Sequence, residues 1–295
     1  MTQQFNLDEI IEQAANESAD MSEASKGGGG ATPPNAGTCI ATLIGYIELG
    51  RRIKKGFKGA PDKKVRKARW IFELAGGTNP HTKSEDGTTT FAKRITVHTW
   101  LPEPGKQPSD KSGFYKLFSA INHAKDPKIK IPAQLLGKHV KVIVSQEKFT
   151  PEGGGDEITY GSIGNAQDGF RISPARIDVV GEDGMPTGEF RLINAPEVIS
   201  SQRCFLWDYA TQQMWDSLFI EGEYEAVEAK DGQAARPAKT KNVIQEEIKL
   251  ALDWKGSKMQ SLLGDGGELD VAGLEEDSTV STGGVAGEDA LAGLL

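Results

Sequence analysis

Residues 38–50, TCIATLIGYIELG, are mostly apolar, and a short apolar run of this kind predicts a buried strand. Two further stretches, KARWIFEL at 67–74 and FAKRITVHTW at 91–100, alternate between inward-facing and outward-facing residues, as strands with one face on a core do. The first part of the chain therefore predicts three successive strands, with a basic, turn-rich segment between the first two.

The following segments predict a helix and a hairpin. In SGFYKLFSAINHA, at 112–124, large apolar residues recur at helical spacing behind Ser112, a candidate N-cap. HVKVIVSQEKF, at 139–149, alternates again, and the turn PEGGGD leads from it into EITYGSIG at 157–164. This order matches the OB-fold, a five-stranded, partly open barrel. We therefore expect a mainly β protein in which a five-stranded OB-fold barrel carries a helix between strands three and four.

The charges divide the chain into four parts, although the net charge is only -8. Residues 1–36 carry six Asp and Glu against Lys26 alone, and residues 37–180 carry 24 Lys and Arg against 14 Asp and Glu. Residues 181–263 carry 9 basic against 14 acidic residues, and residues 264–295 carry eight acidic residues and no basic one. The predicted parts are a flexible acidic N-terminal segment (1–36), a basic OB-fold nucleic-acid-binding domain (37–180), a helical C-terminal extension (181–263) and a disordered acidic tail (264–295). The extension is expected either to pack on the barrel or to form a small subdomain that faces a partner.

Basic residues are concentrated between positions 51 and 69, where ten of nineteen residues are Lys or Arg and only Asp62 is acidic. So many positive charges close together repel one another unless a polyanion neutralises them, and this favours phosphate binding. Cations interleaved with aromatic rings are typical of proteins that bind single strands, whose bases stack on the rings. The predicted phosphate contacts are Arg51, Arg52, Lys54, Lys55, Lys63, Lys64, Arg66, Lys67, Arg69, Arg94 and Lys141. The predicted stacking residues are Tyr46, Phe57, Trp70 and Trp100.

Each of these predictions has a simpler alternative. The basic cluster can be an ordinary solvated face, because a charge excess alone does not identify a ligand. Trp70 lies on the apolar face of its strand and can equally belong to the core. Trp100 is the better stacking candidate, because it shares a strand face with Arg94 and His98.

The sequence contains no pattern that indicates catalysis. Four His and two Cys are scattered without the paired spacing of a zinc site. Glu247 and Lys249 have the Glu-x-Lys spacing of some metal-dependent nucleases, but they fall within NVIQEEIKLALDW, whose amphipathic pattern predicts a helix with a solvated face. We therefore expect no catalytic residues, no metal ligands and no cofactor. No apolar run approaches the roughly 18 residues that span a bilayer, so no membrane partner is expected.

The segments TLIGYIELG, KARWIFEL, TTTFAKRITV, LLGKHVKVIV and ITYGSIG, in this order, resemble phage-encoded OB-fold single-stranded DNA-binding proteins. The resemblance covers roughly residues 38–180, and FLWDYATQQMWDSLF and KNVIQEEI also look similar to later parts of such proteins. The acidic end resembles partner-recruiting tails of single-stranded DNA-binding proteins. It departs from the bacterial type, which ends in Pro-Phe, because this chain ends in LAGLL.

The resemblance implies a non-enzymatic protein that binds single-stranded DNA with little sequence preference in phage replication or recombination. It implies the cytoplasm of an infected bacterial host, which the two distant cysteines also favour. The acidic tail would limit DNA binding by competition and recruit replication or recombination proteins, while the oligomeric state stays open. The alternatives are a virion or scaffold protein whose basic face binds an acidic partner, and a nuclease that uses Glu247 and Lys249.

Overall fold

The computed structural model describes residues 32–56, 59–84, 86–150, 157–224, 226 and 238–264. The chain divides into two compact units, Met1–Thr32 and Pro33–Leu295, and nearly all of the described residues belong to the second. The predictions of a flexible N-terminal segment and a disordered acidic tail therefore fall almost wholly outside the described residues. No helix among the described residues is long and apolar enough to cross a membrane.

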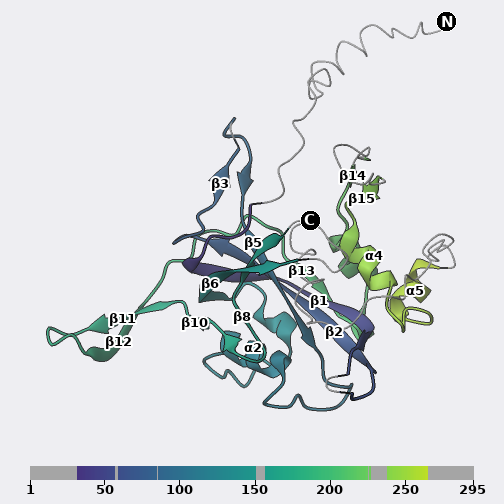
Figure 1. The fold of residues 1–295 in the computed structure, drawn as a ribbon, viewed down its shortest axis with the longest axis horizontal. Helices are drawn as coiled ribbons and strands as arrows, with labels where there is room; N and C mark the ends of the chain where they lie inside the picture. Colours follow the sequence, from purple (N-terminus) through teal and green to yellow (C-terminus); the bar gives the residue numbers. More distant parts are fainter. Residues whose placement is uncertain are drawn as a thin grey trace, which may run out of the picture. The chain divides into compact units, whose positions relative to one another are not determined.

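The main sheet has the strand order β10-β6-β1-β2-β5 and is antiparallel along this path (Figure 1). Its strands are β1 (Gly37–Lys54), β2 (Lys63–Ala75), β5 (Arg94–Trp100), β6 (His139–Phe149) and β10 (Ile172–Pro174). Two more strands join it: β7 (Ile158–Ser162) pairs with β6, and β13 (Arg203–Phe205) pairs in parallel with β1. The three predicted strands and the predicted β6–β7 hairpin are confirmed.

The strand β1 holds this sheet together, because its first half pairs with two neighbours at once. Residues 37–42 pair with β6, and β2 pairs with β1 from Ile40 to Lys54, with irregularities between Leu43 and Gly45 and between Glu48 and Arg51. At these irregularities the alternation of side chains shifts, so that β1 contributes to a core on each face of the sheet.

One core lies between the sheet and α2 (Gly113–Ile121), which follows β5 and precedes β6 as predicted. Ser112 caps this helix, because its side-chain oxygen accepts a hydrogen bond of 3.2 Å from the backbone N–H of Tyr115. Phe114, Leu117 and Ile121 of α2 are buried against a set of fully buried side chains of the sheet. That set includes Leu43, Tyr46, Trp70, Phe72 and Leu74.

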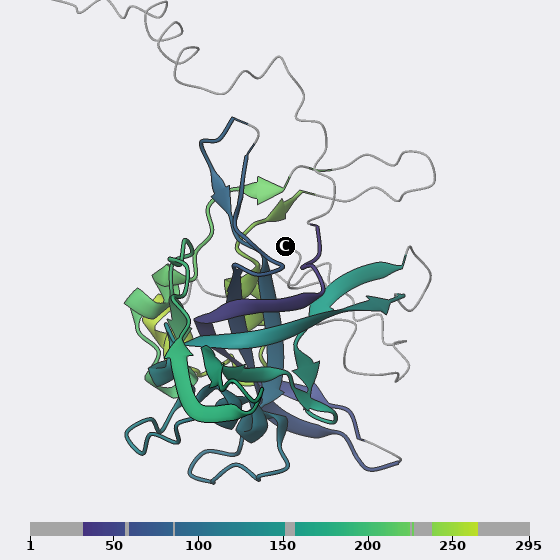
Figure 2. The same ribbon diagram turned by 90° about the vertical axis from the view of Figure 1, so that its left-hand side faces the viewer.

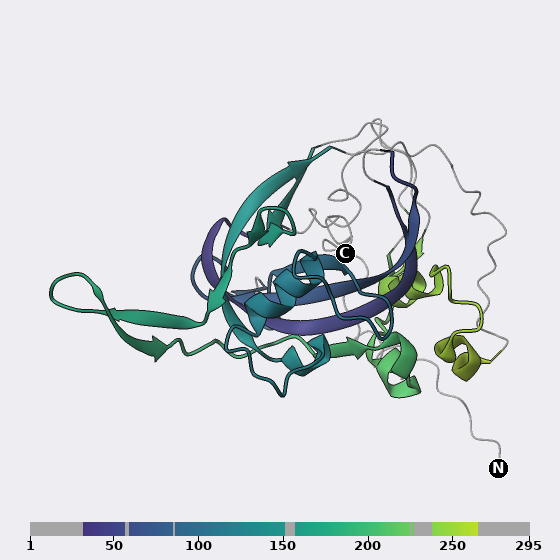
Figure 3. The same ribbon diagram turned by 90° about the horizontal axis from the view of Figure 1, so that it is seen from below.

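The second core lies between β1 and the C-terminal extension, seen in green and yellow in Figure 3. The helical elements of the extension are η2 (Trp207–Tyr209), α3 (Gln212–Ser217), α4 (Val243–Lys249) and α5 (Lys258–Leu263). Ile47 and Leu49 of β1 pack with Phe205, Trp215 and Trp254, among others. Gly50 permits the close approach of Trp207 of the extension to β1, because a Cβ at position 50 would come within 2.5 Å of the Trp207 ring. The extension is therefore packed on the sheet, the first of the two predicted alternatives.

The description of residues 181–263 as a helical extension needs correction, because the segment also contains strands. It includes β12 and β13, and its helices have only six or seven residues. The remaining described elements, several of them visible in Figure 2, are four two-stranded pairs and the 3-10 turn η1. They are β3 (Thr82–Lys83) with β4 (Thr90–Phe91), β8 (Gly164–Asn165) with β9 (Gly169–Phe170), β11 (Arg176–Val180) with β12 (Pro186–Leu192), β14 (Glu223–Tyr224) with β15 (Lys239–Thr240), and η1 (Pro132–Leu135).

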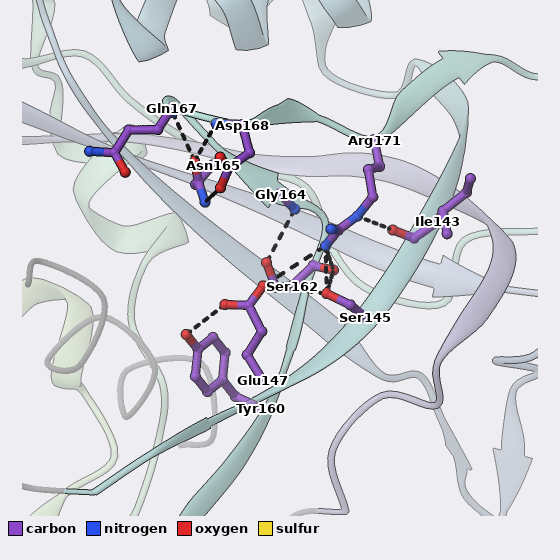
Figure 4. Close-up of polar contacts among 10 residues, drawn as sticks. All are labelled: Ile143, Ser145, Glu147, Tyr160, Ser162, Gly164, Asn165, Gln167, Asp168 and Arg171. Carbon is purple, nitrogen blue, oxygen red and sulfur yellow. Dashed lines mark hydrogen bonds and ion pairs between the residues drawn. The ribbon is translucent and has the colours of Figure 1, made fainter.

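A polar network fixes the outer end of β6 to β7 and to the segment before β10 (Figure 4). The Arg171 guanidinium donates hydrogen bonds to the Ser145 hydroxyl at 2.5 Å and to the backbone oxygens of Ile143 and Ser162. The Tyr160 hydroxyl donates to the Glu147 carboxylate at 3.0 Å. Burial together with this hydrogen bond raises the pKa of Tyr160 to about 12, so its proton stays in the network at neutral pH.

Candidate nucleic-acid interface

The β1–β2 hairpin carries most of the predicted phosphate contacts, and its arginines are bound within the protein. Arg66 donates to both carboxylate oxygens of Asp208, at 2.5 and 2.8 Å. Arg51, its cross-strand partner, donates to Glu103 at 2.8 Å, and its Nε lies 3.8 Å from Asp253. Asp208 and Asp253 belong to the extension, so the extension supplies carboxylates to the predicted phosphate-binding arginines.

The other two arginines of the hairpin contact α4. Arg69 is 3% exposed and forms an ion pair with Glu247, whose backbone oxygen accepts a hydrogen bond from Arg52. Arg69 also donates from Nε to Nε2 of His98 at 3.3 Å. Burial holds the pKa of His98 well below its ordinary value, and the charges of Lys67 and Arg69 add to this effect, so the ring is neutral and accepts the hydrogen bond.

The lysines of the hairpin have a different environment from the arginines. Lys54 is paired across the strands with Lys63, and Lys67 is paired with Trp100 of β5. Lys63 and Lys67 are four residues apart and so lie on one face, and the Lys54 ammonium lies 5.7 Å from the centre of the Trp100 ring. Lys54 and Lys63 are exposed, while Lys67 and Trp100 are partly exposed. We call these four residues the lysine–tryptophan surface.

The remaining predicted cations lie outside this surface or have protein partners. Lys55 forms an ion pair with Asp62 at 3.2 Å, and Lys64 is exposed on the opposite face of the hairpin. Arg94 donates to the Ser200 hydroxyl at 3.0 Å, and Lys141 donates to the backbone oxygen of Arg176 at 3.3 Å. The remaining predicted stacking residue in the hairpin loop, Phe57, lies outside the described residues.

Two of the predicted stacking residues are wrong. Tyr46 and Trp70 are both 0% exposed, with their ring centres 5.0 Å apart in an edge-to-face contact. The Trp70 Nε1–H donates to the Thr99 hydroxyl at 2.9 Å, and the Tyr46 hydroxyl donates to Glu48 at 3.2 Å. These rings are core residues with satisfied polar atoms, and no base can stack on them without opening the core.

The sequence interpretation missed the carboxylates that attach the extension to the sheet. Glu73, 1% exposed, accepts hydrogen bonds from the backbone N–H groups of Ile199 and Ser200 at 3.0 and 2.9 Å. Glu48 accepts from the backbone N–H of Trp207 at 2.9 Å, and burial raises its pKa above the ordinary value. The opposite net charges of the basic domain and the extension indicate that the two parts attract each other. They do not identify which residues form the contacts.

The nuclease alternative named Glu247 and Lys249, which both lie on α4. Glu247 pairs with Arg69, and the Lys249 ammonium lies 3.4 Å from Glu246. Within the part of the chain that the structure describes, no group of three or more His, Cys, Asp or Glu side chains is arranged to hold a metal ion. Glu247 therefore attaches α4 to β2, and Lys249 pairs with a neighbouring residue of α4.

Comparison of the chain with models of protein families, with curated proteins and with solved structures gives no match. Among the features described, the lysine–tryptophan surface has the chemistry that the sequence analysis associated with single strands: cations beside an accessible ring.

Proposed function

We propose that this protein is a non-enzymatic, largely sequence-independent single-stranded DNA-binding protein, and that the lysine–tryptophan surface contacts the strand. The observation that carries the proposal is the position of Lys54, Lys63, Lys67 and Trp100 on one face of β1, β2 and β5. Lysine ammonium groups follow the phosphates while a base stacks on the indole, a combination that tolerates any sequence because every base has a π-face.

The topology supports assignment of the main sheet to the OB-fold. The first strand pairs with both the second and the fourth long strand, the third pairs with the second, and the fifth forms a hairpin with the fourth. The helix α2 lies between strands three and four in the chain. In an OB-fold the second and third strands form the binding face. Lys63 and Lys67 lie on β2, the second long strand, and Trp100 lies on β5, the third.

The wider setting that we propose is phage DNA replication or recombination in the cytoplasm of an infected bacterium. The family resemblance supports this setting. The proposed role of the acidic tail, competition with DNA and recruitment of a replication or recombination protein, is supported by its eight acidic residues and absence of basic ones. The structural description ends at Gly264, where this tail begins.

Tryptophan fluorescence gives a direct test, because the structure describes all five tryptophans and only Trp100 is not buried. Oligo-dT of increasing length should quench the emission, and duplex DNA of the same length should quench it less. Trp100→Ala should remove most of the quenching and weaken binding by roughly 1–3 kcal/mol, with little change in melting temperature.

The matched control is Trp254→Phe, which alters a buried tryptophan of the second core. It should leave both the quenching by oligo-dT and the affinity near those of the unaltered protein. Binding without dependence on strand length or strandedness would contradict the proposal and favour the alternative of an acidic protein partner. Equal affinity of Trp100→Ala and the unaltered protein would remove the stacking role.

A further inference from the structure

A pocket of about 460 Å³ lies among α2, the loop after β5 and the η2 turn. This volume is within the range of small-molecule sites in proteins. Its aromatic walls include Phe114, Tyr115 and Phe118 of α2 and Tyr209 of η2. Tyr115 is 41% exposed and Tyr209 is 71% exposed, so two of these rings can be reached from solvent.

Charged groups accompany the rings in this pocket. Lys106 and Lys130 line it and are exposed, and the Arg66–Asp208 ion pair lines it as well. The Nε–H of Arg66 is buried and has no hydrogen-bond partner. Rings with cations and hydrogen-bonding carboxylates suit a ligand that has a flat apolar face, polar edges and negative charge. A nucleotide has all three properties.

Some residues that line the pocket are direct sequence neighbours of residues in the lysine–tryptophan surface. Leu101 and Pro102, which line it, directly follow Trp100, and Arg66 directly precedes Lys67. The backbone N–H of Leu101 donates to the backbone oxygen of Arg66 at 2.9 Å, which joins the two segments. Because neighbouring residues of a strand point to opposite faces, Arg66 and the pocket lie on the other face of β2 from Lys67. A bound strand that leaves Trp100 would have to turn around the end of β5 to reach the pocket.

We propose that this pocket receives one nucleotide of a bound DNA single strand, with its base against the Tyr115 and Tyr209 rings and its phosphate near Lys106 or Lys130. This inference rests on the proposed function and adds a second contact to it. Trp100 and the lysines contact the strand on the outer face of the sheet, and the pocket takes a base that is turned away from its neighbours.

The test is binding of the full-length protein to dT oligonucleotides, using Tyr115→Ala and Tyr209→Ala together. The fold should survive this change, because Tyr209 is largely exposed, Tyr115 is partly exposed, and the Ser112 cap uses only the backbone of Tyr115. Loss of stacking should weaken binding roughly 5- to 150-fold, which corresponds to about 1–3 kcal/mol. Tyr224→Ala, at an exposed ring of β14, is the matched control and should bind normally.

Photocrosslinking supplies a second readout that does not depend on mutant stability. Oligo-dT with 5-iodouracil at one position should crosslink to Tyr115 or Tyr209 as well as to Trp100. If replacement of Lys54, Lys63 and Lys67 weakens binding while the double tyrosine variant binds normally and neither tyrosine crosslinks, the proposed function stands and the pocket inference is overturned. If the unaltered protein does not bind the oligonucleotide at all, the proposed function itself fails.

Discussion

The arginines and the lysines of the β1–β2 hairpin lie side by side in sequence but have different roles. Arg51, Arg52, Arg66 and Arg69 bind oxygens of Glu103 or of the extension, whereas Lys54, Lys63 and Lys64 are exposed. A guanidinium presents a planar set of donors that fits a carboxylate, while an ammonium is a compact, strongly hydrated charge on a flexible stem. The comparison teaches that a dense basic stretch can be divided by residue type, with the arginines bound within the fold and most of the lysines left exposed.

This division also limits the surface that phosphates can reach. The extension places Asp208, Glu247 and Asp253 against the arginines of the hairpin. If the proposed function holds, the charge that DNA meets is mainly that of the exposed lysines. Under the proposed function, we expect fewer phosphate contacts than the ten cations of residues 51–69. Three variants would break or sharpen the contrast.

The largest effect is expected for Arg69→Ala, which leaves the Glu247 carboxylate without its partner at the buried contact between α4 and β2. Removing one member of such a pair costs about 3 kcal/mol of unfolding free energy or more. Urea unfolding followed by circular dichroism measures it. Lys64→Ala on the same strand is the control and should change stability by less than about 0.5 kcal/mol, because its side chain is exposed. Similar losses for the two variants would contradict the division.

The next effect concerns salt dependence. Replacing Lys54, Lys63 and Lys67 together with Ala should reduce the slope of log affinity for oligo-dT against log salt by about 2, since each phosphate contact contributes about 0.7 on single strands. Replacing Lys83, Lys125 and Lys138 is the matched control, because these are three exposed lysines outside the hairpin. The control should keep the original slope, and an equal reduction in both variants would show that only net charge matters.

The smallest effect is expected at the Arg66–Asp208 pair, which is half exposed on the Asp208 side. The hydrogen bond from Arg66 lowers the pKa of Asp208 below its ordinary value of 3.8. Because the folded-state pKa is depressed, the stabilisation is complete above the unfolded-state pKa and is lost as the pH falls below about 4. Asp208→Asn should therefore cost about 0.2–1 kcal/mol at pH 7, and this difference should shrink at pH 3.

Asp216→Asn is the control for that measurement, because the Asp216 carboxylate accepts a hydrogen bond from Gln212 rather than from an arginine. Urea titrations of both variants at pH 7 and pH 3 give the comparison. A constant difference between Asp208→Asn and the unaltered protein at the two pH values would mean that the ion pair does not contribute through the charge of Asp208.

Local patterns were sufficient for the strands and for α2 because their physical causes are local. The alternation from Ala68 to Leu74 separates an apolar face from one that carries Arg69 and Glu73, and Ser112 caps the helix through a residue three positions away. The same alternation places Trp70 on the apolar face, so the pattern itself favours a core position over a stacking role for this ring. Tyr46 was harder to place, because the irregularities of β1 shift which side chains face each core.

The sequence by itself determined the order of the main strands, the position of α2, the basic hairpin and the acidic character of the extension, since each follows from neighbouring residues or from composition. Only the tertiary structure decided which cations are engaged by the protein. Arg69 meets Glu247 across 178 positions, and Arg66 meets Asp208 across 142. Such contacts depend on how the extension packs over β1. The pattern of residues within either segment does not predict that packing. The pocket beside α2 has the same origin, because its walls come from segments that only the fold brings together.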